Sequence, residues 1–411
     1  MTDRALFEPL ESRRMLTAAI PTNNEQLLLE LLNRARANPA AEAKRYGIAL
    51  NEGLPAGTIS TKAKQPLAFN PYLIDAARKH SQDMIDHDYF AHQGSDGSQP
   101  QDRMTSSGYF FDPTKTRGSG ENIAWQGTTG SINQTTGTSD LHKGLFVDEG
   151  IVGRGHRTNI MNPSFKEVGT GVVGGVYTQN ATNYNSVMVT EDFAYVDNGV
   201  YLTGVAYTDR VKDDDFYTPG EGIRVTITAT RQSDNLKLTT KSWASGGYSL
   251  KLPAGAYTVK ATGTPLGTTL TYNVVISNQN VKLDLVKPGS TDLTPPTALL
   301  NASNLTSSGQ QFYTFKVFYN DNSLIKASTI GAGDIFVTAT GYSQTATLVS
   351  KSPTANASSI VATYRIPAAN GDWDSADNKT YTVKLVSKQV TDASGKPVKA
   401  GSLGTFIVDI P

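Results

Sequence analysis

The spacing of apolar residues changes partway along this chain, and the change limits the folds that the chain can adopt. In residues 24–46 and 71–87 apolar side chains recur at helical spacing. After residue 156 apolar and polar residues alternate instead, which is typical of paired strands. Helices that precede strands within one segment, here residues 24–197, favour an α+β fold.

A few residues predict where these helices begin and end. Asn24 is a suitable N-cap for the first helix, and Pro39 interrupts that helix. Pro71 suits the first turn of the second long helix, because its missing N–H is not needed there. A shorter helix is expected over residues 99–107.

The remainder of the chain consists of short alternating runs separated by Gly and Pro turns. Runs of this kind predict small β-sandwiches. A stretch with Pro and Gly at residues 287–296 marks a linker between two such units. We therefore expect an N-terminal leader at 1–20, an α+β domain at 24–197, and β-sandwiches at 199–288 and 294–411.

Composition excludes several classes of function. The chain has 37 basic and 37 acidic side chains, so it lacks the basic field that would hold a nucleic acid backbone. It has no cysteine, which rules out disulfides, thiolate catalysis and thiolate zinc sites. No stretch approaches the run of about 18 apolar residues that a transmembrane helix needs.

Three short motifs together give the chain its only constellation of side chains that could handle metals or protons. Histidine is rare, with five in 411 residues, yet His92 and His156 lie in motifs that flank a third motif containing Glu121. Two neutral imidazoles can hold Zn²⁺, and a nearby carboxylate can orient an imidazole or act as a base. Catalytic zinc normally has three protein ligands, so two histidines also suit a weaker, non-catalytic site.

The other candidates have simpler interpretations. His80 falls on the apolar face of the second long helix and is expected to be structural. His87 and His142 lie in polar surroundings, so we expect both at the surface. Ser81 has no base beside it, and a serine nucleophile is therefore not supported.

The order of the motifs in residues 24–197 is similar to that of the CAP superfamily, which comprises cysteine-rich secretory proteins, antigen 5 and plant pathogenesis-related proteins. The form here resembles the cysteine-free bacterial one, an SCP-like extracellular domain. No single piece is specific, but the combination is. The matching pieces include Leu31-Leu32-Asn33-x-Ala35-Arg36, Ala77-x-x-His80-Ser81-x-Asp83-Met84, Phe90-Ala91-His92, Asp102-Arg103-x-x-x-x-Gly108-Tyr109, Gly120-Glu121-Asn122-Ile123-Ala124 and Gly155-His156-Arg157.

This resemblance implies an α-β-α sandwich with a cleft that holds two histidines and two glutamates. His92, Glu121 and His156 match three of the four positions. Glu149 is the natural candidate for the fourth. Asp148 competes with it, because the tryptophan that usually accompanies this glutamate is missing here.

Two neighbours of the motif residues are expected to support the cleft. Asn122 can hydrogen-bond loop backbone, and Arg157 can clamp a carboxylate such as Glu121. The metal ligands implied for Zn²⁺ are His92 and His156. In a hydrolytic version of the site, Glu121 or Glu149 would be the base.

The N-terminal segment bears on the location of the protein. Residues 7–18, which include Leu10-Glu11-Ser12-Arg13, resemble a short signature found on many planctomycete extracellular proteins. This resemblance implies export from a bacterium. We therefore expect an extracellular or cell-surface location.

The later units also have family likenesses. Residues 199–288 resemble carboxypeptidase-regulatory-like and B-type repeats of prealbumin-like fold, and residues 294–411 resemble an Ig-like repeat of planctomycete surface proteins. An acidic loop in the first of these units suits Ca²⁺, which takes several carboxylate oxygens, although a solvated acidic turn is the alternative. The candidate calcium ligands are Asp209, Asp213, Asp215 and Glu221.

The sequence leaves three functions open. In the preferred one, the cleft binds a small lipid, glycan or peptide together with a divalent cation and has no turnover. The β-sandwiches then display the cleft at a cell surface or matrix. In the second, the protein is a metal-dependent hydrolase of peptides or cell-wall material. In the third, it is a structural or adhesive surface protein with a vestigial cleft.

Overall fold

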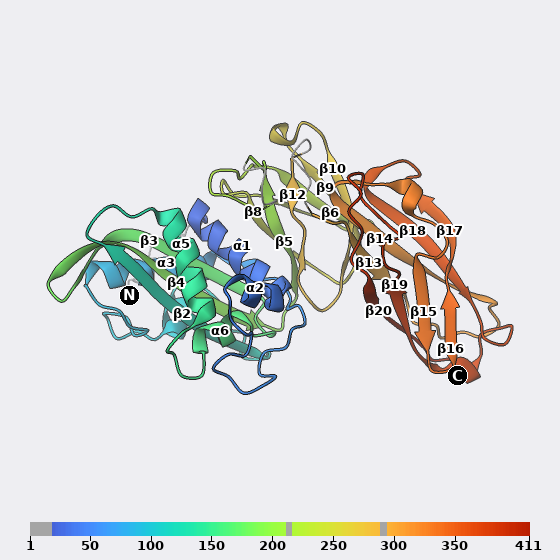
Figure 1. Cartoon of the computed structure of the whole chain (residues 1–411), viewed down its shortest axis with the longest axis horizontal. Helices are drawn as coiled ribbons and strands as arrows, with labels where there is room; N and C mark the ends of the chain where they lie inside the picture. Colours follow the sequence, from blue (N-terminus) through green and yellow to red (C-terminus); the bar gives the residue numbers. More distant parts are fainter. Residues whose placement is uncertain (1–18, 211–215, 288–293) are drawn as a thin grey trace, which may run out of the picture.

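The computed structural model describes residues 19–210, 216–287 and 294–411. These residues form three units that follow one another along the long axis of the molecule (Figure 1). The first unit combines helices with a sheet, and the next two consist almost entirely of strands. The expected order, an α+β domain followed by β-rich units, is confirmed.

The first unit is built on a sheet with the strand order β1-β3-β4-β2. β3 and β4 form a long antiparallel hairpin, β2 is antiparallel to β4 at one edge, and β1 is parallel to β3 at the other. Because β2 is an edge strand, one of its sides is free for loops and helices to approach. The elements are α1 Asn23–Ala37, α2 Pro39–Arg45, β1 Ala68–Phe69, α3 Pro71–Asp86, α4 Pro100–Ser106, β2 Arg117–Thr128, α5 Gln134–Val147, α6 Gly155–Ile160, β3 Glu167–Gln179 and β4 Thr182–Val196.

Helices cover both faces of this sheet (Figure 1). On one face, Leu28 of α1 and Leu141 of α5 pack with Val187 of β4. On the other face, Met84 of α3 packs with Met188. Neighbouring residues of a strand point to opposite faces, so β4 contributes to both layers. The first unit is thus the three-layered α-β-α arrangement that the motifs imply.

Two glycines allow α3 to lie directly on β3. A Cβ atom at Gly169 would lie 1.9 Å from the carbonyl carbon of Leu73, and a Cβ atom at Gly171 would lie 2.4 Å from that of Ala77. Any larger side chain at these positions would push the helix away from the sheet. The two glycines therefore fix the position of α3, which carries His80.

The helix boundaries differ in part from the expected ones. Thr22, and not Asn24, caps α1, in a capping box with Glu25. Asn38 separates α1 from α2 and caps the latter, in agreement with the expected interruption. The sequence pattern does not predict α5, which is rich in Thr, Ser and Gly and has low intrinsic helix propensity. Its buried Phe146 anchors it in the core.

The second unit has two sheets around one core, and it is attached to the first unit by buried polar contacts. Asn280 Nδ2 donates to the carbonyls of Pro66 at 2.9 Å and Lys166 at 2.7 Å. Lys282 Nζ lies 2.9 Å from Glu30 Oε2 of α1. The strands are β5 Val200–Tyr207, β6 Thr226–Arg231, β7 Lys237–Lys241, β8 Gly247–Leu252, β9 Gly255–Thr262, β10 Leu270–Ile276, β11 Val281–Lys282 and β12 Leu285–Val286.

The third unit likewise has two sheets, with orders β13-β14-β18-β17 and β16-β15-β19-β20, that share one aromatic-rich core. It contacts the second unit through Asn320, whose Nδ2 donates to the Asn273 carbonyl at 2.7 Å. The strands are β13 Thr297–Asn301, β14 Phe312–Ile325, β15 Ile335–Ala339, β16 Tyr342–Thr345, β17 Thr347–Ser352, β18 Ala357–Pro367, β19 Lys379–Leu385 and β20 Gly401–Val408.

Candidate functional site

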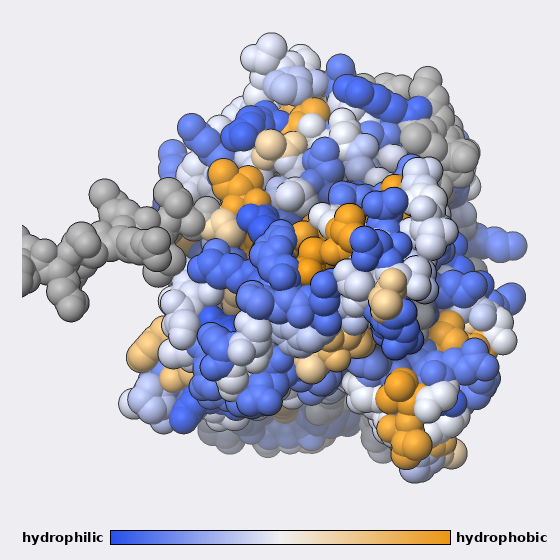
Figure 2. All heavy atoms as spheres, turned by 90° about the vertical axis from the view of Figure 1, so that its left-hand side faces the viewer, coloured by the Kyte–Doolittle hydropathy of each residue, from blue (hydrophilic) through white to orange (hydrophobic). Residues whose placement is uncertain are grey.

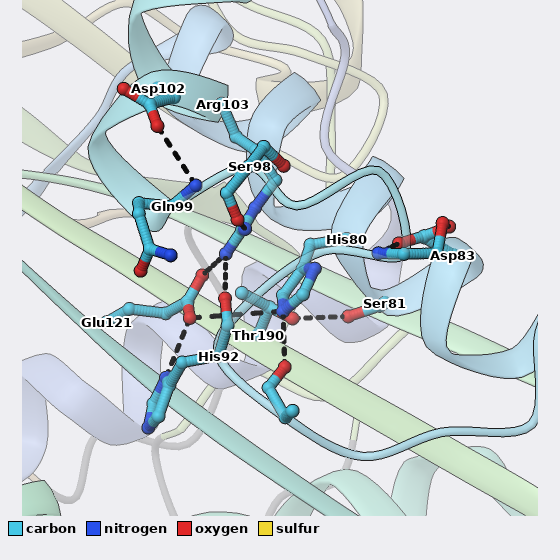
Figure 3. Close-up of polar contacts among 12 residues, drawn as sticks. His80, Ser81, Asp83, His92, Ser98, Gln99, Asp102, Arg103, Glu121 and Thr190 are labelled. Carbon is cyan, nitrogen blue, oxygen red and sulfur yellow. Dashed lines mark hydrogen bonds and ion pairs between the residues drawn. The ribbon is translucent and has the colours of Figure 1, made fainter.

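Glu121 is the centre of the first group of candidate residues. It lies on the edge strand β2 and is only 8% exposed. Its Oε1 accepts a hydrogen bond from His92 Nδ1 at 2.8 Å, and its Oε2 accepts one from Arg103 Nη2 at 2.5 Å (Figure 3). Arg103 Nη2 also donates to the His92 carbonyl at 2.9 Å. Arg103 therefore holds the loop of His92 against Glu121.

The expected clamp between Arg157 and Glu121 is wrong, because Arg103 occupies that role. Arg157 is fully buried and donates to backbone carbonyls instead, including those of Phe146 at 2.6 Å and Leu50 at 3.0 Å. These bonds satisfy carbonyl groups at the end of α5 and in the loop after α2. Arg157 is thus a support residue for the segment that leads to His156, and it makes no contact with the carboxylate.

A second histidine–carboxylate pair joins His156 to Asp148. His156 Nδ1 lies 2.7 Å from Asp148 Oδ1, while Asp148 Oδ2 accepts the backbone N–H of His156 at 3.0 Å. Asp148 follows α5 directly, in the left-handed conformation with φ of 54°, which turns its side chain back toward α6. The hydrogen bond to Asp148 raises the pKa of His156, and burial opposes this effect only in part.

Asp148, and not Glu149, therefore stands beside the second histidine. Asp148 is 2% exposed and bonded to His156, whereas Glu149 is exposed and makes no hydrogen bond or ion pair within the described residues. Glu149 still lines the cavity next to His156. Of the two alternatives that the sequence leaves open for the fourth position, the geometry favours the aspartate.

Both pairs are attached to the same two residues of β2. Asn122 Nδ2 donates to the His156 carbonyl at 3.3 Å, and Asn159 Nδ2 donates to the Glu121 carbonyl at 3.3 Å. Asn159 also donates to Asn122 Oδ1 at 2.9 Å. Adjacent residues of a strand face opposite ways, so the two pairs lie on either side of the β2 edge. The role expected for Asn122, a bond to loop backbone, agrees with these contacts.

Two carboxyl groups that the motifs do not include lie buried beside this edge. Glu191 and Asp192 of β4 are the register partners of Asn122 and Glu121, and both are completely buried. Burial raises the pKa of Glu191 to about 7. Burial, together with the negative charge of Glu121, raises the pKa of Asp192 well above its usual range. Two acidic residues within a long apolar strand are the signal that could have identified them from the sequence.

An open groove of about 310 Å³ lies beside His156. Its walls are largely apolar and include Trp125, Leu145 and Phe90, while Asp148 and Glu149 supply its negative charge. Figure 2 shows the end of the first unit, where apolar residues form small separate patches among hydrophilic ones.

Each of the two histidines is bonded to its own carboxylate, His92 to Glu121 and His156 to Asp148. Each Nδ1 faces a carboxylate, so each Nε2 carries the lone pair, which is the second-shell pattern of metal-binding histidines. Neither Nε2 makes a hydrogen bond within the described residues. That part of the chain contains no group of three or more acidic or histidine side chains arranged to hold a metal ion.

The remaining histidines behave only partly as expected. His80 is buried on α3, as predicted, and its Nε2 lies 3.1 Å from the Ala91 carbonyl. His87 is exposed and pairs with Asp83 at 2.8 Å, which agrees with a surface position. The surface position expected for His142 is wrong. His142 is fully buried in α5, because that helix, which the sequence pattern does not predict, turns it into the core 3.5 Å from Glu42.

The proposed calcium ligands are described only in part. Asp213 and Asp215 lie outside the described residues. Asp209 is buried, and Glu221 accepts backbone N–H groups from Arg210 at 2.7 Å and Thr218 at 2.9 Å. The Glu221 carboxylate thus already accepts hydrogen bonds from the backbone of its own loop. The calcium site stays a prediction.

Comparison with known proteins identifies the class of the first unit. Residues 29–193 match the model of the CAP family, described as the cysteine-rich secretory protein family. This range contains both histidine–carboxylate pairs and the whole β-sheet except the end of β4. The match agrees with the resemblance that the motifs carry, and we refer to the first unit as the CAP domain.

Individual relatives cover only part of the chain. The uncharacterized protein YkwD of Bacillus subtilis (strain 168) is 34% identical over 122 residues, which amount to 28% of this chain and 38% of that protein. A solved extracellular protein with an SCP domain from Bacillus anthracis str. Ames is 23% identical, with a TM-score of 0.25, over 41% of this chain and 39% of that one. Within the described residues no helix is long and apolar enough to cross a membrane.

Proposed function

We propose that this protein is an exported binding protein whose CAP domain takes a small ligand with an apolar part in the groove beside His156. The observation that carries this proposal is the position of the His156–Asp148 pair in the wall of a largely apolar groove of about 310 Å³. A groove with apolar walls and a few polar groups is the usual form of a small-molecule site. Export is supported by the family description and by the resemblance of the N-terminal segment.

The groove can be filled without disturbing the fold. Gly144 of α5 lines the groove, and a Cβ atom built there meets nothing within 4 Å. A Gly144→Phe variant should therefore fold normally and occupy the space. Gly331 of the third unit is equally open and provides the matched control, Gly331→Phe.

The binding experiment uses the full chain with three probes: palmitate, a chitin oligosaccharide and a mixed short-peptide library. We expect at least one probe to bind wild type and Gly331→Phe alike, and Gly144→Phe to lose about tenfold or more in affinity. Equal binding to both glycine variants would place the ligand elsewhere, and no binding of any probe class would reject the proposed groove.

We further propose that His92 and His156 bind a divalent cation through their Nε2 atoms. The support is that a carboxylate orients each imidazole, as in many metal sites. Zinc titration should give a weaker dissociation constant for the double variant His92→Ala, His156→Ala than for wild type. The control is His87→Ala, an exposed histidine that also pairs with a carboxylate. Unchanged affinity in the double variant removes the cation from the proposal.

A hydrolase is the second candidate, and the His156–Asp148 pair favours it. A histidine oriented by a carboxylate can act as a general base, and the hydrogen bond to Asp148 raises the pKa of His156, which makes it a stronger base. A screen with peptide and cell-wall substrates, run on wild type and on His156→Gln, separates the two functions. Turnover that disappears in His156→Gln establishes the hydrolase, and no turnover in wild type leaves the binding protein.

The β-sandwich units are proposed to hold the CAP domain away from a cell surface or matrix. The contacts of Asn280 and Lys282 with the first unit support a fixed rather than a loosely tethered arrangement. Small-angle scattering of wild type against a double variant, Asn280→Ala, Lys282→Met, tests this point. We expect the double variant to show a broader distribution of sizes, and an unchanged profile would contradict it.

A further inference from the structure

A second cavity, of about 260 Å³, lies on the side of Glu121 that faces α3 and α4, away from the groove. It is lined by residues of α3, of the loop that contains Ser95 and Ser98, and of the end of α4. Figure 3 shows His80, Ser98 and Arg103 from these three segments. A single water needs only about 10–15 Å³ of such space, so the cavity can hold a much larger molecule. None of the residues that line the groove lines this cavity.

Polar groups without partners surround this cavity. His80 Nδ1 and Arg103 Nε are both buried and have no hydrogen-bond partner. The hydroxyl groups of Ser106 and Ser107 also make no hydrogen bond within the described part of the chain. Ser106 is exposed, so water can satisfy its hydroxyl. Buried polar groups are normally hydrogen-bonded, and the two unpaired ones in residues that line this space, His80 Nδ1 and Arg103 Nε, point to a missing polar occupant.

The required pattern of donors and acceptors can be read from these atoms. His80 Nε2 faces the Ala91 carbonyl, so that nitrogen carries the proton and Nδ1 is an acceptor. Burial lowers the pKa of His80, which keeps the ring neutral. Arg103 Nε is a donor, and the hydroxyls of Ser106 and Ser107 can act in either way. An occupant must therefore both donate and accept hydrogen bonds within a short distance, as a hydroxyl group does.

The charges around the cavity balance. Lys79 and Arg103 contribute two positive charges, and Asp83 and Asp96 contribute two negative ones. The Asp83 carboxylate already accepts two hydrogen bonds from Ser95, one from its backbone N–H and one from its hydroxyl. A strongly charged ligand would meet a like charge on one side, and an apolar ligand would leave the polar groups unpaired. A neutral ligand rich in hydroxyl groups avoids both costs.

We propose that this cavity binds a small neutral polyhydroxylated molecule, a polyol or a single sugar unit, that pairs with His80 Nδ1, Arg103 Nε and the serine hydroxyls. The cavity lies below the range of about 300–1,000 Å³ that is typical of drug-sized ligands, which agrees with a ligand of this size. Free sugars and the terminal unit of a glycan share this chemistry.

Such a ligand would also be connected to the candidate cleft. Arg103 lines the cavity and bonds Glu121 with Nη2, and His80 Nε2 lies 3.9 Å from Glu121 Oε1 (Figure 3). The occupant would therefore fix two side chains that hold the His92–Glu121 pair.

The test measures binding of glycerol, glucose, N-acetylglucosamine, a short chitin oligosaccharide and inorganic phosphate to the full chain. Ligand-observed NMR gives the affinity, and the ¹⁵N shift of the His80 imidazole gives the location. Ser106→Leu places an apolar side chain at the cavity, and Thr105→Leu on the neighbouring exposed position of α4 is the control. We expect millimolar or tighter binding of at least one sugar or polyol, a shift of His80 Nδ1, and a loss of about tenfold or more in Ser106→Leu only.

The outcomes separate the alternatives. Binding of the oligosaccharide but of no free sugar assigns the site to glycan ends, which keeps the proposal. Binding of phosphate alone, binding that Ser106→Leu leaves intact, or binding that does not shift His80 overturns it, and so does no binding at all, since the cavity would then hold water. Gly144→Phe, which fills the groove, should leave this binding unchanged, so failure here is distinct from failure of the proposed groove.

Discussion

The interior of the CAP domain and the interior of the third unit are built from different kinds of side chain. The third unit packs aromatic rings, with ring centroids of Tyr313 and Phe406 4.1 Å apart and those of Trp373 and Tyr381 5.4 Å apart. Among the described residues, the buried charged side chains of the third unit are the four aspartates Asp321, Asp334, Asp377 and Asp392. The CAP domain buries more charged side chains, and of both signs. These are Glu25, Glu30, Arg36, Glu42, Asp148, Arg157, Glu167, Glu191 and Asp192.

The difference shows which kind of interaction stabilises each unit. Apolar and aromatic packing is non-directional and tolerates changes of similar volume, which suits a spacer. Buried charges stabilise only in the right geometry, because each unpaired group costs free energy. In the CAP domain two of these charged residues, Asp148 and Arg157, hold the segment that carries His156, so part of its core belongs to the site. Four variants test this contrast.

The largest effect is expected for Arg157→Met. The variant leaves carbonyls of the α5 end and of Leu50 without donors in a buried place, which should cost about 4 kcal/mol or more. Hydrogen exchange of β3 and β4 peptides measures the stability of this unit directly. Arg231→Met, which removes an arginine paired with Asp234 at the surface of the second unit, should change nothing measurable. A mild effect of Arg157→Met would mean that the buried charges are not essential to the CAP core.

Glu191→Gln should change the pH dependence of stability. In the unfolded chain this carboxyl loses its proton near 4.5, and in the folded chain it holds the proton to about 7. The stabilisation by the protonated form is therefore complete below pH 4.5 and is lost as pH rises to 7. Since one pKa unit corresponds to about 1.4 kcal/mol, wild type should lose ~3 kcal/mol relative to Glu191→Gln over this range.

Melting of wild type and Glu191→Gln at pH 4.5, 6 and 8 checks this expectation. The difference between the two melting temperatures should grow in favour of the variant as pH rises. A Glu52→Gln variant, which changes an exposed carboxylate, provides the comparison at each pH. A constant difference across the series would show that Glu191 titrates normally.

A smaller effect is expected from Asp148→Asn. The carboxylate of Asp148 raises the pKa of His156, so removing its charge should lower that pKa toward or below 6.5. NMR titration of the histidine ring protons measures the change in each variant. Glu149→Gln should leave the titration of His156 as in wild type, because Glu149 does not contact this ring. A changed titration of His156 in Glu149→Gln, with none in Asp148→Asn, would favour Glu149 for the fourth position of the cleft.

Much of the fold of the CAP domain could be predicted from the sequence, because periodicity and caps are local signals. Pro71 and the apolar face of α3 mark that helix, and its end at Asp86 lies within one residue of the expected one. α5 could not be predicted, since burial of residues such as Phe146 holds it together in spite of weak propensity. The misplaced His142 follows from the same omission.

The site was predictable only where a motif carries it. His92, Glu121 and His156 stand in recognisable motifs. The carboxylate beside His156 was left open between Glu149 and Asp148, and only the geometry decides for Asp148. Whether Arg103 or Arg157 bonds Glu121 depends on which segment packs against β2. The sequence alone does not indicate which segment does so. Glu191 and Asp192 escape prediction because their role depends on burial beside Asn122 and Glu121, from a strand that is distant in the sequence.

The smallest effect is expected in the third unit, for Trp373→Phe. The indole Nε1 of Trp373 is buried without a hydrogen-bond partner, so the change removes an unsatisfied donor while it opens a small cavity. These two effects oppose each other, and the net cost should stay within about 1 kcal/mol. Tyr381→Phe, which removes a hydroxyl bonded to the Asp377 carbonyl at 3.1 Å, should cost more although it deletes fewer atoms. If Trp373→Phe lost as much stability as Arg157→Met, the aromatic core of the third unit would be as sensitive to substitution as the core of the CAP domain. The contrast between the two units would then not hold.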